Sequence, residues 1–457
     1  MKLIVPKYYE SFSCKGGACS DNCCIGWEID IDEKTLSRYK STMGEIGKKL
    51  SDNIEKSGEV SHFRMCRDGR CPFLNSENLC ELFIGLGEDS LSDICREHPR
   101  YYTTVGDCTY GGVGLCCEAA AELILSEKTQ HSYVVIENNS QNSKHFFYRM
   151  TDGADDEYDP IIGEAVGRLW GLIADRNSDL SIPDEDSGAV GIMCRILYLC
   201  REMDEVLGEY GISADCDTHL DISPSREGYA AFLEEFFEKW NVDRSNISLN
   251  RFSTKFVDKT DAEKHSERPA SCLDGLKTND GNTLATDGRD SLILRALNGF
   301  LDLEYLGDTL PKIIEGLKNK PAREYLPLHG NAAAYLENLV RYLFDRYFIV
   351  SGIDGDPIGK LSVIVSCSLL LCLLLSDLLS GKNVHLDIFN DKNAKNDNNY
   401  LHILDKTQDF EFDRVVKLAV LFSKEIEYNE DNIETLSSLF DFEMAAEAIA
   451  LIRSLLK

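Results

Sequence analysis

Apolar residues recur three and four positions apart along most of this chain, which is the spacing that places them on one face of a helix. Between these segments lie shorter stretches rich in glycine, proline and acidic residues. The pattern therefore predicts a mainly α protein. Beyond residue 125 the predicted helices cover residues 161–174, 188–207, 229–240, 291–303, 310–319, 331–350, 360–379, 413–427 and 443–456.

The first 125 residues follow a different pattern. Residues 27–32 alternate apolar and acidic side chains, which predicts a short strand, and helices are predicted at residues 33–50 and 118–126. Glycines and prolines break up the rest of this region into turns. We therefore predict an irregular cysteine-rich N-terminal metal-binding module over residues 1–125. An all-α helical domain follows it over residues 126–457.

Two segments of unusual composition lie within the predicted helical domain. Residues 253–288 are polar with few large apolar groups, which predicts a mobile insertion. Residues 361–376 are apolar except for serines, but they fall short of the roughly 20 residues that a membrane-spanning helix needs. Asp377 then interrupts the run. This segment predicts a buried core helix, so we expect no membrane partner.

The formal net charge of −30 also bears on function. Such a charge repels phosphates, so we expect no nucleic-acid partner. It would attract a lysine-bearing substrate, although a well-solvated acidic surface is the simpler explanation of the charge. Near the start, Leu3-Ile4-Val5 is too short a run for a signal-peptide core. We therefore expect a cytoplasmic protein whose thiols stay reduced, and not a disulfide scaffold.

Cysteine is concentrated in the N-terminal region, where eleven of the 17 cysteines fall within 117 residues. Four of them form a C-x4-C-x3-C-C pattern, and single cysteines and an adjacent pair follow. Thiolates are soft ligands that suit zinc and iron–sulfur clusters. Structural zinc is usually held by two C-x2-4-C pairs, which this spacing does not provide. The adjacent Cys23 and Cys24 suit a larger cluster or two sites, so iron–sulfur is favoured and zinc stays an alternative.

Three N-terminal stretches resemble one known family. They are "SCKGGACSDNCCIGWEIDIDEKTLSRY", "CPFLNSENLCELFIGLGEDSLSDICREHPRYY" and "GLCCEAAAELIL". Together they resemble the flagellin lysine-N-methylases, relatives of the zinc- or iron-chelating cysteine-cluster proteins. Cys117 stands where that family usually has proline, and His98 where it usually has tyrosine. The cysteines that match the family's metal-binding pattern are Cys14, Cys19, Cys23, Cys24, Cys71, Cys80, Cys95 and Cys116.

The resemblance implies a specific activity, which is the methylation of lysine side chains on flagellin. It implies S-adenosylmethionine as the methyl donor and a [4Fe-4S] cluster in the cysteine module. A non-enzymatic zinc-binding interaction protein and a cluster-bearing redox protein stay as alternatives. The nearest match to a nucleotide-binding glycine loop is Gly111-Gly112-Val113-Gly114, so Gly111, Gly112 and Gly114 are the candidate donor-binding residues. No βαβ pattern surrounds them.

Lysine methylation needs a neutral amine, and deprotonating a lysine at pH 7 costs roughly 4–5 kcal/mol. A site recovers this cost by desolvating the amine or by supplying a carboxylate. The predicted helix 331–350 carries a polar stripe in which Asn338, Tyr342 and Arg346 recur every four residues, with Glu337 beside them. We take these four as candidate catalytic residues. An exposed helix face braced by ion pairs is the alternative explanation.

Overall fold

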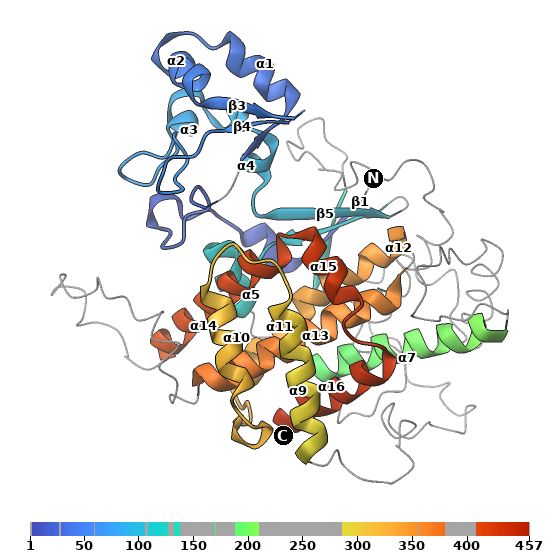
Figure 1. The fold of residues 1–457 in the computed structure, drawn as a ribbon. Coiled ribbons are helices and arrows are strands. Elements are labelled where there is room, and N and C mark those ends of the chain that lie inside the picture. Colours follow the sequence, from blue (N-terminus) through green and yellow to red (C-terminus); the bar gives the residue numbers. More distant parts are fainter. Residues whose placement is uncertain are drawn as a thin grey trace.

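The computed structural model describes residues 2–26, 29–58, 60–105, 108–126, 132–137, 170, 188–209, 286–354, 356–379 and 408–456. An outer lobe, residues 29–97, stands above a larger helical body (Figure 1). Its small sheet has the strand order β2-β4-β3. The elements of the outer lobe are β2 (Asp30–Ile31), α1 (Glu33–Ser41), α2 (Gly44–Asn53), β3 (Ile54–Ser57), β4 (Val60–Phe63), α3 (Glu81–Leu86) and α4 (Asp93–Glu97).

The acidic positions of the predicted strand 27–32 explain how the outer lobe is held together. Asp32 caps α1, because one carboxylate oxygen accepts the backbone N–H of Thr35 at 2.8 Å. Its other oxygen accepts the N–H of Asp93 at 3.0 Å, at the start of α4. One side chain therefore fixes two helices. The strand itself is shorter than predicted, and residues 27–28 lie outside the described residues.

A second sheet joins the N-terminal region to the helical body, in the order β5-β6-β1-β7. Its strands are β1 (Lys2–Pro6), β5 (Arg100–Val105), β6 (Cys108–Val113) and β7 (Tyr133–Glu137). β1 pairs parallel to β6 and antiparallel to β7. The expectation of an irregular module is therefore wrong in this respect, since two sheets order it. Pairing of residues 2–4 with residues 108–110 is a long-range contact that no local pattern reveals.

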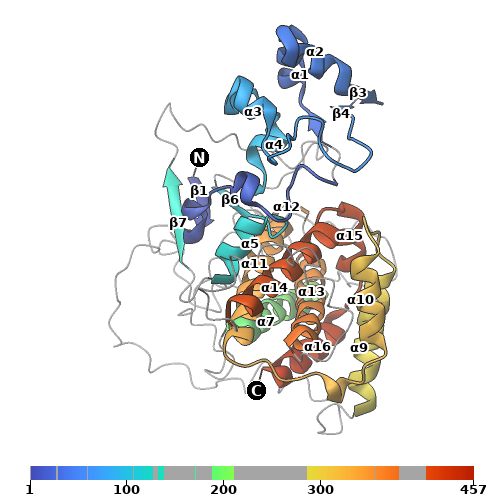
Figure 2. The same cartoon turned by 90° about the vertical axis from the view of Figure 1, so that its left-hand side faces the viewer.

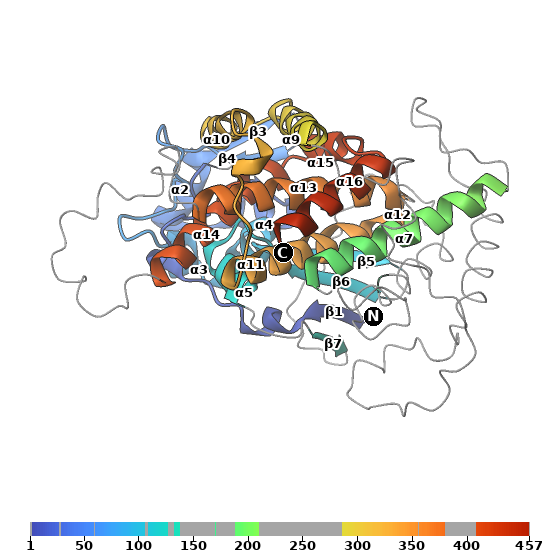
Figure 3. The same ribbon diagram turned by 90° about the horizontal axis from the view of Figure 1, so that it is seen from below.

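The helical body confirms the mainly α prediction. Figure 3 shows α13 between the α9–α10 pair and the layer made by α11 and the sheet. Predicted helices 188–207, 291–303, 310–319, 331–350, 360–379, 413–427 and 443–456 are present with ends shifted by a few residues. The helices are α5 (Glu118–Ser126), α7 (Gly188–Glu209), α9 (Thr286–Leu301), α10 (Thr309–Lys318), α11 (Asn331–Tyr347), α12 (Ser351–Asp354), α13 (Pro357–Leu379), α14 (Gln408–Phe422), α15 (Glu430–Ser437) and α16 (Phe442–Leu455).

α13 is the apolar segment that the sequence predicts as a core helix. It is the one helix of the described ranges that is long and apolar enough to cross a membrane, and 94% of that stretch is buried inside the protein. It packs against α7, α11, α15 and α16. The prediction of a buried core helix is confirmed.

One hydrophobic core runs through the sheet and the helical body. Leu3, Ile4 and Val5 of β1 belong to the same buried cluster as α11 and α13. Figure 2 shows β1, β6 and α5 lying against α11, with the outer lobe set apart. The predicted boundary at residue 125 stays a prediction. The predicted helices 161–174 (Trp170 apart) and 229–240, and most of the insertion 253–288, lie outside the described residues, although Thr286 already begins α9.

Candidate functional site

A cavity of about 400 Å³ lies where the outer lobe meets the helical body. This volume is within the range of small-molecule sites, and its lining is mostly apolar. From the N-terminal region it is lined by Cys23, Cys24, Ile94, Cys95 and His98, and from the helical body by Leu306, Lys424, Glu425 and Tyr428, among others. Three of the eight predicted metal ligands therefore face this cavity, which we call the junction cavity.

The cysteine wall of the junction cavity is held by local hydrogen bonds. Asn22 accepts the backbone N–H of Cys24 at 2.9 Å, and the carbonyl of Cys24 accepts the N–H of Cys71 at 2.8 Å. Cys95 lies on α4, which Asp32 fixes. Cys24 donates to Cys23, and this bond lowers the pKa of the Cys23 thiol below its ordinary value.

His98 lies on the same wall. Its Nε2 is buried and has no hydrogen-bond partner among the described residues. Burial lowers the pKa of the ring to about 4, with Lys424 and Arg100 adding to the effect, so the imidazole is neutral at pH 7. Buried polar atoms usually have a hydrogen-bond partner, so this unpaired nitrogen is an exception within the cavity wall. The sequence singled out His98 as a departure from the family pattern and as a possible metal ligand, although a lone histidine is usually structural or at the surface.

The opposite wall is built on a π-helix, Ser423–Glu427, which continues α14. Such wide turns often occur at functional sites. Here it directs Glu425 into the junction cavity, where the carboxylate accepts the backbone N–H groups of Leu306 at 2.8 Å and Gly307 at 3.2 Å. Lys424 forms an ion pair with Asp21 and so ties this wall to the cysteine loop, residues 14–26.

A buried polar network lies directly behind Tyr428. The hydroxyl of Tyr428 is 2.8 Å from Sγ of Cys116. The next residue back, Glu427, is fully buried and accepts hydrogen bonds from Tyr342 at 3.1 Å and Tyr347 at 3.0 Å. Arg346 lies 3.5 Å from the same carboxylate and donates to Tyr342 at 2.9 Å. Because this charged network is paired, it holds the cavity wall in one arrangement.

The four candidate catalytic residues on α11 are therefore placed behind the cavity or away from it. Tyr342 and Arg346 belong to the network described above, and Tyr342 also accepts the N–H of Leu115 at 3.3 Å. Asn338 is buried and donates to the carbonyl of Leu125 at the end of α5. Neither Asn338 nor Glu337 lines the junction cavity. The alternative of an exposed face is wrong for Asn338 and Tyr342, which are 4% and 1% exposed.

The candidate donor-binding glycines have a packing explanation. Gly111 and Gly112 lie in β6 opposite Tyr102 and Tyr101. A Cβ atom at Gly112 would come within 2.4 Å of Tyr101, and one at Gly111 within 2.8 Å of the Tyr102 ring. At Gly114 it would meet Cys116 and Arg346, both at 3.3 Å. Tyrosine rings therefore fill the space beside the first two glycines, and donor binding there stays a prediction.

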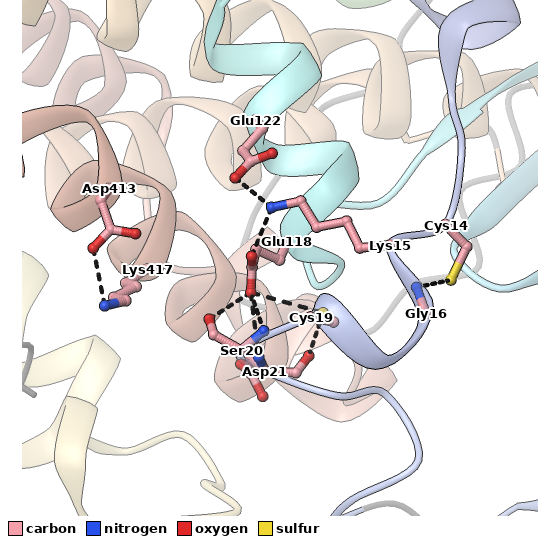
Figure 4. Close-up of polar contacts among 10 residues, drawn as sticks. All are labelled: Cys14, Lys15, Gly16, Cys19, Ser20, Asp21, Glu118, Glu122, Asp413 and Lys417. Carbon is pink, nitrogen blue, oxygen red and sulfur yellow. Dashed lines mark hydrogen bonds and ion pairs between the residues drawn. The ribbon is translucent and has the colours of Figure 1, made fainter. Parts of the chain in front are cut away.

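Glu118, the first residue of α5, organises the cysteine loop (Figure 4). Its carboxylate accepts from Ser20 N at 2.8 Å, Ser20 Oγ at 2.5 Å, Asp21 N at 3.2 Å and Lys15 Nζ at 2.7 Å. Cys19 Sγ is 3.7 Å away. Burial alone would raise the pKa of Glu118, but the bonds from Lys15 and Ser20 outweigh it and lower the pKa to about 2. No sequence pattern pointed to this residue.

The cysteines suit a thiolate-bound metal in their chemistry. The fifteen described cysteines are free thiols. Burial raises the pKa of Cys71 to about 11 and that of Cys95 to about 12, so at neutral pH they ionise only beside a positive charge such as a metal. Within the described ranges, no three side chains of Cys, His, Asp or Glu are grouped as they would be around a single ion.

Comparison with known proteins gives matches over about a quarter of the chain. The flagellar biosynthetic protein FliU of Salmonella muenchen is 32% identical over 130 residues, which is 27% of this chain and 76% of FliU. Lysine-N-methylase of Salmonella typhimurium is 31% identical over 130 residues, and that of Salmonella choleraesuis 29% over 128 residues. Each of these two matches covers 27% of this chain and 32% of the enzyme. No protein-family model and no solved structure matches.

Proposed function

Because the chain belongs to the flagellin lysine-N-methylase family, we propose that it is a protein-lysine N-methyltransferase. Its methyl donor is S-adenosylmethionine, its substrate is flagellin, and it acts in the cytoplasm. The names of the relatives support both the reaction and the flagellar substrate. The match spans about a third of the length of the two lysine-N-methylases, so the activity of the whole chain is part of the proposal.

The junction cavity is the observation that carries this proposal. It is the place where predicted metal ligands, His98 and the carboxylate of Glu425 line one space of about 400 Å³. A donor and the end of a lysine side chain both need to enter such a site. The apolar side chains on its walls, Ile94 and Leu306, are 49% and 69% exposed, which leaves them open to an incoming polypeptide.

The chemistry requires an uncharged amine at this place. Ile94 and Leu306 would remove water from the lysine ammonium, which favours its neutral form. Glu425 then takes the proton that the ammonium must lose, since its carboxylate is held in the cavity by two backbone N–H groups. The amine lone pair forms the new N–CH₃ bond as the S–CH₃ bond of the sulfonium breaks, and the sulfur keeps that electron pair.

The cysteine wall is the proposed seat of the [4Fe-4S] cluster, with zinc as the alternative metal. Cys24 and Cys95 would present such a centre to the cavity. When bound, an iron with an open position offers a site for the amino and carboxylate groups of the donor.

The test is a methylation assay with protein purified without oxygen. The chain is incubated with methyl-labelled S-adenosylmethionine and its cognate flagellin, and peptide mass spectrometry locates the label. We expect label on lysine Nε, and a large loss of rate in Glu425→Gln, which keeps an oxygen for the two N–H groups. Metal-loaded protein that leaves lysine unlabelled contradicts the proposal. Colourless protein with stoichiometric zinc and no transfer favours an interaction module.

A further inference from the structure

Two tyrosines, Tyr305 and Tyr428, line the junction cavity from the side of the helical body. The hydroxyl of Tyr305 donates to the backbone carbonyl of Phe300, a fully buried residue of α9, at 2.5 Å. The hydroxyl of Tyr428 is bonded to Sγ of the buried Cys116 at 2.8 Å. Because both polar ends are engaged inside the protein, these side chains present their rings to the cavity.

The charged groups on the same lining favour a cation. Glu304 and Glu425 both belong to it. Among the described residues their carboxylates have neutral partners, which are Asn429 Nδ2 at 3.3 Å for Glu304 and two backbone N–H groups for Glu425. The lysine of this lining, Lys424, forms an ion pair with Asp21 and so adds no excess positive charge. Two rings and two carboxylates therefore share one wall.

The loop that carries Glu304 and Tyr305 joins α9 to α10 and is fixed by hydrogen bonds at both ends. Asn432, which is 2% exposed, accepts the backbone N–H of Glu304 at 2.9 Å and donates to its carbonyl at 2.8 Å. Leu306 and Gly307 donate their N–H groups to a carboxylate of the same wall. The Tyr305 ring lies between these anchors. A ligand that binds to it therefore loses little affinity to ordering of the protein.

Methyl transfer from a sulfonium donor keeps one positive charge in the cavity from start to finish. The charge lies first on the donor sulfur and then on the methylated nitrogen of the lysine. Both are onium cations that carry alkyl groups, whereas the ammonium of an unmodified lysine is compact and strongly hydrated. The faces of aromatic rings attract alkylated cations of this kind.

We propose that Tyr305, Tyr428, Glu304 and Glu425 form an onium-binding wall, which binds an alkylated cation in preference to an unmodified lysine ammonium. The rings attract the cation, and the two carboxylates balance its charge. The cation is the methylated lysine nitrogen or the sulfonium of the donor, an identity that rests on the proposed function. No annotated motif marks this wall in the sequence, since its residues come from two loops more than a hundred positions apart.

The binding of choline tests the wall without any methyl transfer. The comparison is its uncharged analogue, in which a quaternary carbon replaces the nitrogen, and calorimetry measures both on the full chain purified without oxygen. We expect choline to bind at least roughly tenfold more tightly. Tyr305→Leu should remove this preference, and Tyr305→Phe should keep it because the ring remains. Glu304→Gln should weaken it, whereas Asp302→Asn, which removes a carboxylate outside the cavity, should leave it unchanged.

Two further pairs of probes distinguish the source of the cation. The first pair is trimethyl-lysine and lysine, both with blocked ends, and the second is S-adenosylmethionine and the uncharged thioether S-adenosylhomocysteine. A preference for trimethyl-lysine that is lost in Tyr305→Leu assigns the wall to the substrate. A preference for S-adenosylmethionine that is lost in the same variant assigns it to the donor.

Equal affinities for choline and its uncharged analogue in the wild-type chain, or binding of neither, overturn the inference, and this result needs no variant. A preference that survives in Tyr305→Leu overturns it as well. Methylation of flagellin lysine without any preference for the cation refutes this inference alone. A clear preference without lysine methylation leaves it standing and refutes the proposed function instead.

Discussion

Replacing Glu118 by glutamine should loosen the cysteine loop without unfolding the protein. The Glu118 side chain is 12% exposed, and its carboxylate accepts hydrogen bonds from Ser20 and Asp21 on one side and Lys15 on the other. A glutamine has one carbonyl oxygen and one NH₂ group. Whichever way it turns, an NH₂ group faces donors that formerly met an oxygen.

The size of the effect follows from the bonds that are lost. A hydrogen bond to a charged group contributes about 1.5–3 kcal/mol. Glutamine carries no charge, and its NH₂ group leaves at least one of the two groups of donors, Ser20 with Asp21 or Lys15, without an acceptor. Because Lys15 is 28% exposed, water compensates for part of this loss. We expect the loop to be destabilised by about 3 kcal/mol, which is roughly a hundredfold change in its opening equilibrium.

Hydrogen exchange measures this opening. In Glu118→Gln the backbone amides of Ser20 and Asp21 should exchange roughly a hundredfold faster, while those of α13 keep their wild-type rates. The matched control is Glu122→Gln. Glu122 is 39% exposed and, among the described residues, forms an ion pair with the same Lys15 at 2.5 Å, so a change below about 1 kcal/mol is expected. Unchanged exchange in Glu118→Gln, or an equal effect in Glu122→Gln, refutes the reasoning.

Three further predictions concern the core, the network and the pH dependence. Leu371 of α13 is fully buried, so Leu371→Ala should lower the free energy of unfolding, measured with urea, by about 3 kcal/mol. Leu294 is 40% exposed, so Leu294→Ala should lower it by less than about 1 kcal/mol. Equal losses in the two variants would contradict the packing described. Tyr428→Phe removes the hydrogen bond to Cys116 and should lower kcat/KM about tenfold at unchanged metal content. An unchanged kcat/KM would show that the buried network does not contribute to catalysis. Burial raises the pKa of Asp345 to about 7, although the bond from Tyr133 and the charge of Arg341 act in the opposite direction. A carboxyl group whose pKa is higher in the folded state contributes stability that is fully present below about pH 4 and is lost as the pH rises through 7. Wild type should thus lose up to about 4 kcal/mol of unfolding free energy between pH 4 and 8 relative to Asp345→Asn, and parallel pH profiles of the two proteins would contradict this.

The helices were predictable because each carries its own periodic pattern. α7, α11, α13 and α16 bury one face or all faces against neighbours, and the sequence shows this within a dozen residues. The sheet was not predictable in the same way. β1 is only five residues long, and it becomes a strand because β6 and β7, more than a hundred residues away, pair with both of its edges.

The cysteine-rich region was recognisable from residue type, since thiols at such density point to a metal, and metal binding there stays a prediction. The junction cavity was not. Glu425 and Tyr428 lie in an acidic stretch whose sequence is typical of an ordinary helix end. Only the π-helix, Ser423–Glu427, brings both residues to the wall of one cavity. The α11 stripe was recognisable as polar, but the sequence could not show that Tyr342 is buried and donates its hydroxyl to Glu427.

The central claim is that methyl transfer takes place in the junction cavity, and filling that cavity tests it most directly. Leu306 lines it and is 69% exposed, so Leu306→Trp should fit without disturbing the core. Leu294→Trp fills a separate shallow hollow beside α9 and serves as the control. With metal content and thermal stability matched, we expect lysine methylation to fall at least about tenfold in Leu306→Trp and to stay at the wild-type rate in Leu294→Trp. Equal methylation rates in the two variants would contradict the account.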